Sequence, residues 1–160
     1  KSPETNTVFA SVLEACSSHD PRGVDALAVM ENWGQVFGSV FELGPERKHF
    51  DQLLLAYVEQ SNRGEGNAAG EAMDVIDLLE ELSFTMKPAL VTYLLAIRCV
   101  SHGILAPESN TQSTDVPSPK ESYRQYLLGL LQKVIPLLHE TLDSDDSILA
   151  FQSLGDAICA

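Results

Sequence analysis

The sequence has few cysteines and no long apolar run. Its three cysteines, Cys16, Cys99 and Cys159, are too scattered for a disulfide framework, and each lies in an apolar helical pattern where a free thiol packs as a small hydrophobic group. A reducing intracellular compartment is therefore the simpler interpretation. No apolar stretch reaches the ~20 residues that a membrane-spanning helix requires, because residues such as Arg98 and Pro136 interrupt the longest candidates. We therefore expect no insertion into a membrane.

Basic residues are also scarce. The chain has 10 Lys and Arg against 23 Asp and Glu, which gives a formal net charge of -13. A surface with this balance repels phosphate backbones and anionic lipids, so general nucleic-acid binding is disfavoured and RNA is not the expected ligand. The same balance favours a protein partner, or a multi-subunit complex, with a basic surface.

Sequence motifs of catalysis and of cofactor binding are missing. There is no Gly-x-Ser-x-Gly, His-Glu-x-x-His or phosphate-binding loop, and the four histidines have no nucleophile partner nearby in the sequence. The glycines at 64, 66 and 70 are followed by Glu71 and Asp74 where a phosphate would lie, so this segment is interpreted as a flexible linker. We expect no enzymatic activity and no cofactor.

Two patterns are similar to metal sites and are better explained otherwise. Cys16 with His19 and Cys99 with His102 form two Cys-x-x-His pairs, which together supply the four ligands of a tetrahedral zinc site. The two pairs end helices that are two repeats apart, so we expect a buried cysteine and a partly exposed histidine at each helix end instead. The acidic segment 143–147 lacks the glycine and the final glutamate of a calcium-binding loop. We therefore predict no metal site.

The composition that is present suits a globular protein. The 160 residues are 44% apolar, which predicts one compact domain over 1–160. The sequence begins at Lys1 without an initiator methionine, so we expect a processed product or a fragment of a longer chain. The segment 107–119 is rich in Ser, Thr, Asn and Pro and has no apolar period, which predicts a mobile loop.

Prolines mark the expected helix starts. Pro3, Pro21, Pro45, Pro88 and Pro119 each precede a stretch with helical apolar period, as expected for proline in the first turn of a helix. About seven helices are predicted, at 5–17, 22–41, 46–61, 69–84, 88–102, 120–142 and 146–159. No segment has the alternating pattern of a strand, so the predicted fold class is all-α.

One predicted helix carries a strongly acidic stripe. Within 69–84, acidic residues recur every three or four positions with no basic residue among them, namely Glu71, Asp74, Asp77 and Glu81. The apolar stripe of the same helix comprises Val75, Ile76, Leu78, Leu79 and Leu82. The acidic stripe is interpreted as a solvated face or as a docking surface for a basic partner. A second acidic group follows helix 120–142, namely Asp143, Asp145 and Asp146.

A repeat is visible when the chain is aligned on its prolines. The helix-opening aromatic residues Phe9, Phe50 and Tyr93 are separated by 41 and then 43 residues, and each opens a predicted pair of helices. The segment KPALVTYLLAI at 87–97 resembles the junction between successive pentatricopeptide repeats, where Lys-Pro leads into a Val-Thr-Tyr helix start. The resemblance covers about residues 5–103 and implies stacked helical hairpins.

In the pentatricopeptide family, the residue after the helix-opening aromatic and the residue after the proline read RNA bases. The first role falls here to Ala10, Asp51 and Leu94, and the second to Glu46 and Ala89. Alanine and leucine side chains cannot hydrogen-bond to a base edge, so the resemblance leaves only the two acidic residues as base readers. It therefore implies the family's fold more than its RNA code. It also implies a chloroplast or mitochondrial location, whereas the cytoplasm is expected without it.

The C-terminal part is similar to a HEAT repeat. The segment VIPLLHETLDSDD at 134–146 places a proline in the first helix and an Asp-rich turn after it, and the apolar helix 148–158 follows. Both resemblances imply an α-solenoid of stacked antiparallel helical hairpins. We therefore expect a non-enzymatic scaffold or adaptor that docks onto a larger protein assembly. The alternative is an organellar protein that binds single-stranded RNA in the pentatricopeptide manner.

Overall fold

The computed structural model describes residues 3–19, 28–33, 46–64, 66–82, 87–107, 119–140 and 144–160. Within these ranges all regular structure is helical and no strand is present, which confirms the predicted all-α class. The helices with defined bounds are α1 (Pro3–His19), α3 (Arg47–Asn62), α4 (Ala68–Glu81), α6 (Leu90–Leu105), α7 (Pro119–Glu140) and α8 (Ser144–Cys159). Residues 28–33 are helical as well, and the rest of the predicted helix 22–41 lies outside the described ranges.

The prolines stand at two different positions relative to the helix starts. α1 begins at Pro3 and α7 begins at Pro119, as predicted. The prediction is wrong for Pro88, because α6 begins at Leu90 with Ala89 as its N-cap residue. As the N-cap residue, Ala89 has extended backbone, and its N–H group donates to a side chain of α6, a bond that a proline at this position could not make. Pro21 and Pro45 lie outside the described residues.

Helices α3 and α6 begin in the same way. The backbone N–H of Glu46 donates to Nδ1 of His49 over 2.8 Å, and the backbone N–H of Ala89 donates to Oγ1 of Thr92 over 3.1 Å. In both helices the acceptor lies three residues after the N-cap and immediately before the helix-opening aromatic residue. A side chain at this position that accepts from the N-cap N–H is half of a capping box. The repeat seen in the sequence thus has a structural counterpart at the start of these two helices.

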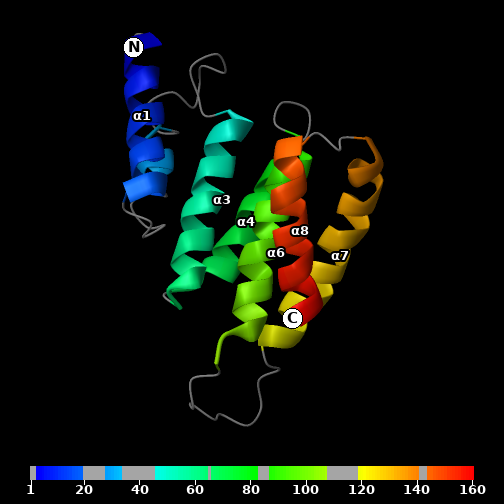
Figure 1. Ribbon diagram of the computed structural model, residues 1–160. Coiled ribbons are helices and arrows are strands. Elements are labelled where there is room, and N and C mark those ends of the chain that lie inside the picture. The colour runs from blue at the N-terminus through cyan, green and yellow to red at the C-terminus, as the bar shows by residue number, and fades with distance from the viewer. Residues whose placement is uncertain are drawn as a thin grey trace.

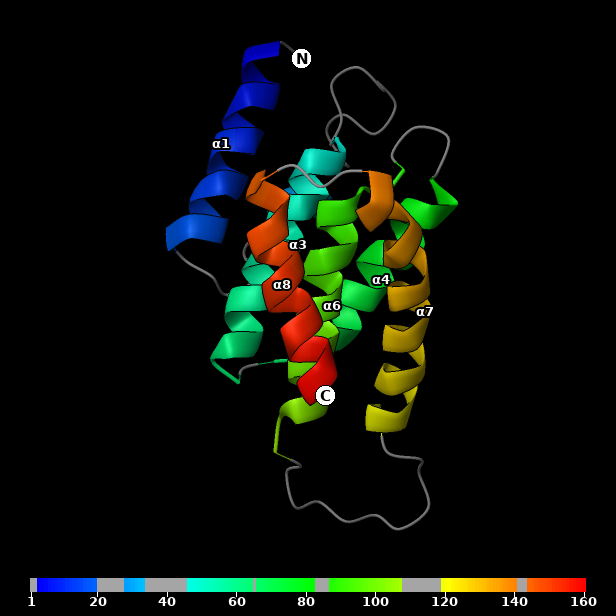
Figure 2. The same cartoon turned by 45° about the vertical axis from the view of Figure 1, so that its right-hand side comes forward.

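Helix α6 lies at the centre of the molecule. It packs against α3, α4, α7 and α8, whereas α1 packs against α3. Figures 1 and 2 show that α1, α3, α6 and α8 run in the same direction and follow one another, while α4 and α7 run in the opposite direction on one side of them. Of the residues of α6, only Leu105 at its end is exposed. The apolar sequence of this helix is therefore explained by neighbours on every side.

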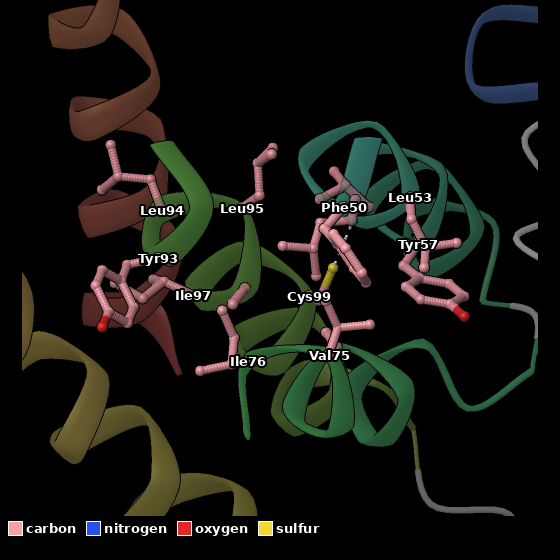
Figure 3. Close-up of a cluster of buried hydrophobic side chains, with 14 of the residues drawn as sticks. Phe50, Leu53, Tyr57, Val75, Ile76, Tyr93, Leu94, Leu95, Ile97 and Cys99 are labelled. Atoms are coloured by element: carbon pink, nitrogen blue, oxygen red, sulfur yellow. Dashed lines mark hydrogen bonds between the residues drawn. The ribbon is translucent and has the colours of Figure 1, made fainter. Parts of the chain in front are cut away.

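The core is formed mainly by side chains of α3, α4 and α6 (Figure 3). In this view Phe50 and Leu53 lie on α3 and Val75 lies on α4, and the thiol of Cys99 from α6 lies between them. Burial of such apolar side chains is the main stabilising contribution, at roughly 1.5–3 kcal/mol for each large one. Helices α4 and α6 approach closely at Gly103, where an added Cβ atom would lie only 2.6 Å from the Cβ atom of a facing alanine.

The end of α6 and the start of α7 are tied together. Nζ of Lys120 donates to the carbonyl oxygen of Ala106 over 2.8 Å, which satisfies a carbonyl group just after the C-terminus of α6. The segment predicted as a mobile loop, 107–119, joins these helices, and its residues 108–118 lie outside the described ranges. In the described parts of the chain, no helix combines the length and the apolar character needed to cross a membrane.

Candidate functional site

Most of the predicted partner-binding residues lie on the side of α4 that points away from the core. Asp74, Asp77 and Glu81 are exposed, and Glu71 is half-buried. The buried residues of the same helix are Ala68, Ala69, Ala72, Val75, Ile76 and Leu79. The helical period therefore separates the acidic stripe from the buried side of α4, as the sequence pattern predicts.

The predicted apolar stripe of α4 is wrong at Leu78 and Leu82. The sequence pattern assigns both side chains to the buried side, but they are 43% and 36% exposed. The reason is that α4 packs against α3 and α6 through a neighbouring stripe, which includes Ile76 and Leu79. The two exposed leucines therefore join Asp74 and Glu81 on one surface, which we call the α4 outer face.

One edge of the α4 outer face contacts α7. The hydroxyl group of Tyr126 lies 2.7 Å from Oδ1 of Asp77 and 3.2 Å from the carbonyl oxygen of Met73. Next to it, the ammonium group of Lys133 pairs with the carboxylate of Glu80. Burial, followed by the hydrogen bond to Asp77, raises the pKa of Tyr126. Asp77 therefore takes part in the contact between α4 and α7, and its predicted role in partner binding stays a prediction.

The other edge of the α4 outer face lies near a buried tyrosine of α3. Tyr57 is only 2% exposed, and its hydroxyl group has no hydrogen-bond partner among the described residues. Burial raises the pKa of Tyr57, and the charges of Glu71, Glu31 and Asp74 raise it further. These carboxylates belong to α4 and to the helical residues 28–33. Together they extend the negative potential of the α4 outer face toward the N-terminal part of the molecule.

The second predicted acidic group has a different status. Asp143 lies outside the described residues. Asp145 and Asp146 lie in the first turn of α8, and their side chains are outside what the structure describes. Acidic residues in a first turn interact favourably with the helix dipole. Their predicted role in partner binding stays a prediction.

Two of the base-reading positions that the pentatricopeptide resemblance implies, Asp51 and Leu94, are engaged within the fold. Oδ1 of Asp51 accepts a hydrogen bond from the hydroxyl group of Thr92 over 2.6 Å. Burial raises the pKa of Asp51, and this hydrogen bond acts in the opposite direction. Leu94 is fully buried in the core, and Glu46 is exposed at the start of α3. Asp51 therefore joins α3 to α6, and its carboxylate is already occupied by a protein donor.

A polar cluster that the sequence pattern does not predict joins α3, α6 and α8. Oγ of Ser61 lies 2.8 Å from Nδ1 of His102. Nε2 of His102 lies 3.1 Å from Oδ2 of Asp156, and Nε of Arg98 donates to the same oxygen over 3.2 Å. Serine, histidine and aspartate in this order are the residue types of a catalytic triad. The three residues are separated by 41 and 54 positions, so the only signal in the sequence is the Cys-x-x-His pair that ends at His102.

The contacts of this cluster connect three helices. The hydroxyl group of Ser61 lies 2.7 Å from the carbonyl oxygen of Val58 and 2.8 Å from Nδ1 of His102, so its single proton has two acceptors within reach. A carboxylate can only accept, so Nε2 of His102 is the donor to Asp156, and in a neutral ring Nδ1 is then an acceptor. Asp156 is also shared with the guanidinium group of Arg98. The cluster therefore links α3 to α6 through Ser61 and α6 to α8 through Asp156.

Of the two Cys-x-x-His pairs, the structure describes the side chains of the second, Cys99 and His102. Cys99 is fully buried, its thiol donates to the carbonyl oxygen of Leu54 over 3.8 Å, and burial raises its pKa. His102 is engaged in the polar cluster. The side chains of Cys16 and His19 are outside what the structure describes. Within the described ranges, no group of three or more histidine, cysteine, aspartate and glutamate side chains is placed to hold a metal ion.

No protein-family model, curated protein or solved structure matches the chain. The pentatricopeptide and HEAT resemblances therefore rest on the sequence motifs alone.

Proposed function

We propose that this chain is a non-enzymatic helical-repeat scaffold that binds a basic protein partner through the α4 outer face. The proposal includes an architecture, an α-solenoid of stacked antiparallel hairpins, and a docking surface. Its setting is a reducing intracellular compartment, which fits the free thiols of Cys99 and Cys159.

The helix contacts support stacked hairpins. Helices α3 and α4 pack as one antiparallel pair and α6 and α7 as the next, and α6 also contacts both helices of the preceding pair. Two hydrogen bonds cross between successive pairs, from Thr92 to Asp51 and between Ser61 and His102. In a solenoid each unit buries its apolar side only against its neighbours, and these contacts have that form.

The observation that carries the docking proposal is the composition of the α4 outer face. Leu78 and Leu82 are exposed beside Asp74 and Glu81, and among the described residues neither carboxylate forms an ion pair. A basic amphipathic helix matches this surface, because its apolar side chains cover the leucines and its Lys or Arg side chains reach the carboxylates. Such pairing supplies both apolar burial and selection for basic partners.

The test compares two variants that change the net charge equally. Asp74→Lys with Glu81→Lys reverses the charge of the α4 outer face, whereas Glu14→Lys with Glu59→Lys reverses two exposed carboxylates on α1 and α3. Each protein is used to capture partners from an extract of the source organism, and bound proteins are measured by quantitative mass spectrometry. A photo-crosslinking residue at position 78 identifies the proteins that contact α4.

We expect the α4 variant to bind the cross-linked partner at least about tenfold more weakly, and the control variant to bind it like the original protein. Higher salt should weaken the same interaction, because the attraction is electrostatic. Circular dichroism should show unchanged helix content for both variants, since exposed charges contribute little to stability. Equal binding by the α4 variant, or recovery of RNA in place of a basic protein, would contradict the proposal.

A further inference from the structure

Two buried oxygen atoms on one side of α3 have no hydrogen-bond partner among the described residues. They are the hydroxyl oxygen of Tyr57 and Oε1 of Gln60, and these two residues are only 2% and 8% exposed. Because the residues are three positions apart, their side chains leave α3 on the same side, on successive turns. Nearly all buried polar atoms in folded proteins are paired, since an unpaired one is costly. The two oxygens therefore indicate a position that a hydrogen-bond donor fills.

The turn between α3 and α4 packs on the end of the Gln60 side chain. Gly66 in this turn has a φ of +67°, and a Cβ atom added to it would lie 2.2 Å from Nε2 of Gln60. The turn thus holds the amide group in place. The ring of Tyr57 points its hydroxyl group out of the apolar cluster, away from α6 (Figure 3). This hydroxyl group is therefore directed toward the surface and not into the core.

Carboxylates of two other elements lie beside the Tyr57 hydroxyl group. Tyr57 lies five residues before the end of α3, and Glu71 lies three residues after the start of α4. At 1.5 Å per residue, both therefore lie within about 8 Å of the turn that joins these antiparallel helices. Burial raises the pKa of Tyr57 most, and the charges of Glu71, Glu31 and Asp74 raise it further. Glu71 is half-buried, whereas Glu31 and Asp74 are exposed at the rim.

A ligand for this position has to be cationic and rich in N–H donors. The hydroxyl oxygen of Tyr57 and Oε1 of Gln60 both accept hydrogen bonds, and a carboxylate only accepts. A guanidinium group presents five N–H donors in one plane. It is also more weakly hydrated than an ammonium group, so it enters a site that excludes water more readily.

We propose that an arginine side chain of the basic partner occupies this position, with its guanidinium group donating to the oxygen atoms of Tyr57, Gln60 and Glu71. The inference rests on the proposed function, because it names the side chain that is recognised at one edge of the α4 outer face. Both unpaired oxygens are covered in the free protein, so neighbouring side chains change rotamer as the arginine enters. Such changes are common at protein interfaces.

The position of Glu71 also predicts a spacing in the partner. Leu78 follows Glu71 by seven residues, which is two turns or about 10.5 Å along α4. A partner helix that covers Leu78 with an apolar side chain therefore carries the arginine about two turns away from that side chain. This spacing distinguishes the partner from a helix that is merely basic.

The probes are two amphipathic peptides of about 20 residues, long enough to form a helix. They share leucines at the same positions, and every basic residue is arginine in one and lysine in the other. Isothermal titration calorimetry measures their binding to the original protein and to Tyr57→Phe, which removes only the unpaired hydroxyl group and should not lower the melting temperature. Gln60→Met is an independent second variant. Tyr93→Phe is the matched control, because the hydroxyl group of Tyr93 donates to Glu80 within the fold.

We expect the original protein and the control to bind the arginine peptide about tenfold more tightly than the lysine peptide. In Tyr57→Phe this preference should fall to about threefold or less, and Gln60→Met should reduce it as well. Asp74→Lys with Glu81→Lys should weaken the binding of both peptides, because it reverses the charge of the α4 outer face.

Two kinds of failure are distinguishable. Equal binding of the two peptides by the original protein, or an undiminished arginine preference in Tyr57→Phe, would overturn this inference and leave the proposed function standing. Binding of neither peptide, or binding that is unchanged by Asp74→Lys with Glu81→Lys, would overturn the proposed function and this inference with it.

Discussion

His49 shows how one residue can serve a helix start and the core together. Its Nδ1 atom accepts the N–H group of Glu46, and its ring lies 4.2 Å from the ring of Trp33 at an angle of 59°, measured between centroids. Trp33 in turn stacks on Phe9 of α1 at 5.9 Å. The imidazole therefore joins α3 to the N-terminal part of the chain. An acceptor nitrogen and a buried position both require the neutral ring.

This arrangement makes stability depend on pH. Burial lowers the pKa of His49 below its ordinary value of 6.5, so the unfolded chain takes up the proton at higher pH than the folded protein does. The contribution is present above the ordinary pKa and is lost as the pH falls below it. We expect a lower melting temperature at about pH 5.5 than at about pH 7.5. The fluorescence of Trp33, the only tryptophan, reports the transition.

The comparison protein for this prediction is His49→Gln, which keeps an acceptor atom and cannot titrate in this range. Its melting temperature should change less between the two pH values than that of the original protein. All other titratable groups are the same in both proteins, so the comparison isolates the contribution of residue 49. An equal loss in the variant would assign the effect to another group.

At the scale of elements, Asp156 provides described polar contacts between α8 and α6. Asp156 accepts from Arg98 and lies within hydrogen-bond distance of His102, and both partners belong to α6. Replacing Asp156 by alanine leaves two largely buried donors without this acceptor, which should cost about 1–2 kcal/mol. Alanine also has the higher helix propensity, so loosening of α8 cannot be attributed to a poorer helix former.

Hydrogen exchange measures this effect locally. In Asp156→Ala, amides of α8 should exchange faster, whereas those in the middle of α3 and α4 should change little. Glu59→Ala on the exposed side of α3 is the control. Faster exchange throughout the chain would show that α8 opens only when the whole molecule unfolds.

The elements themselves were predictable because helical period and proline positions are local signals. The described helices begin and end within three residues of the predicted bounds. The exposure of Leu78 and Leu82 was not predictable. The apolar stripe of α4 is wider than the surface that the neighbouring helices cover, and the sequence does not show which part of the stripe is covered. The meeting of Ser61, His102 and Asp156 depends on how three helices pack, and nothing local in the sequence encodes that distance.

At the scale of the whole molecule, charge is the dominant feature. The structure describes only a few ion pairs, such as those of Lys133 with Glu80 and Arg98 with Asp156, while the chain carries a net charge of -13. Because the basic residues are too few to neutralise the carboxylates, the net interaction among the charges is repulsive. This repulsion opposes the compact state.

We therefore expect sodium chloride to stabilise the protein. Raising its concentration from about 0.05 M to about 0.5 M shortens the screening length from over 10 Å to under 5 Å. The melting temperature at low protein concentration should rise by about 2–4 °C, which corresponds to ~1 kcal/mol in a chain of this size. Sucrose at equal osmolarity is the control for general solvent effects. A fall in melting temperature with salt would mean that attractive ion pairs outweigh the repulsion.

The central position of α6 has a consequence for synthesis on the ribosome. Two of the four helices that cover it, α7 and α8, are encoded after it, and Cys159 lies 54 residues beyond Leu105. At roughly 5–20 residues per second, the apolar sides of α6 stay uncovered for several seconds while the rest of the chain is made. A nascent chain of this kind is a substrate for chaperones that bind apolar helices, and pausing of translation between α6 and α7 would lengthen that exposure.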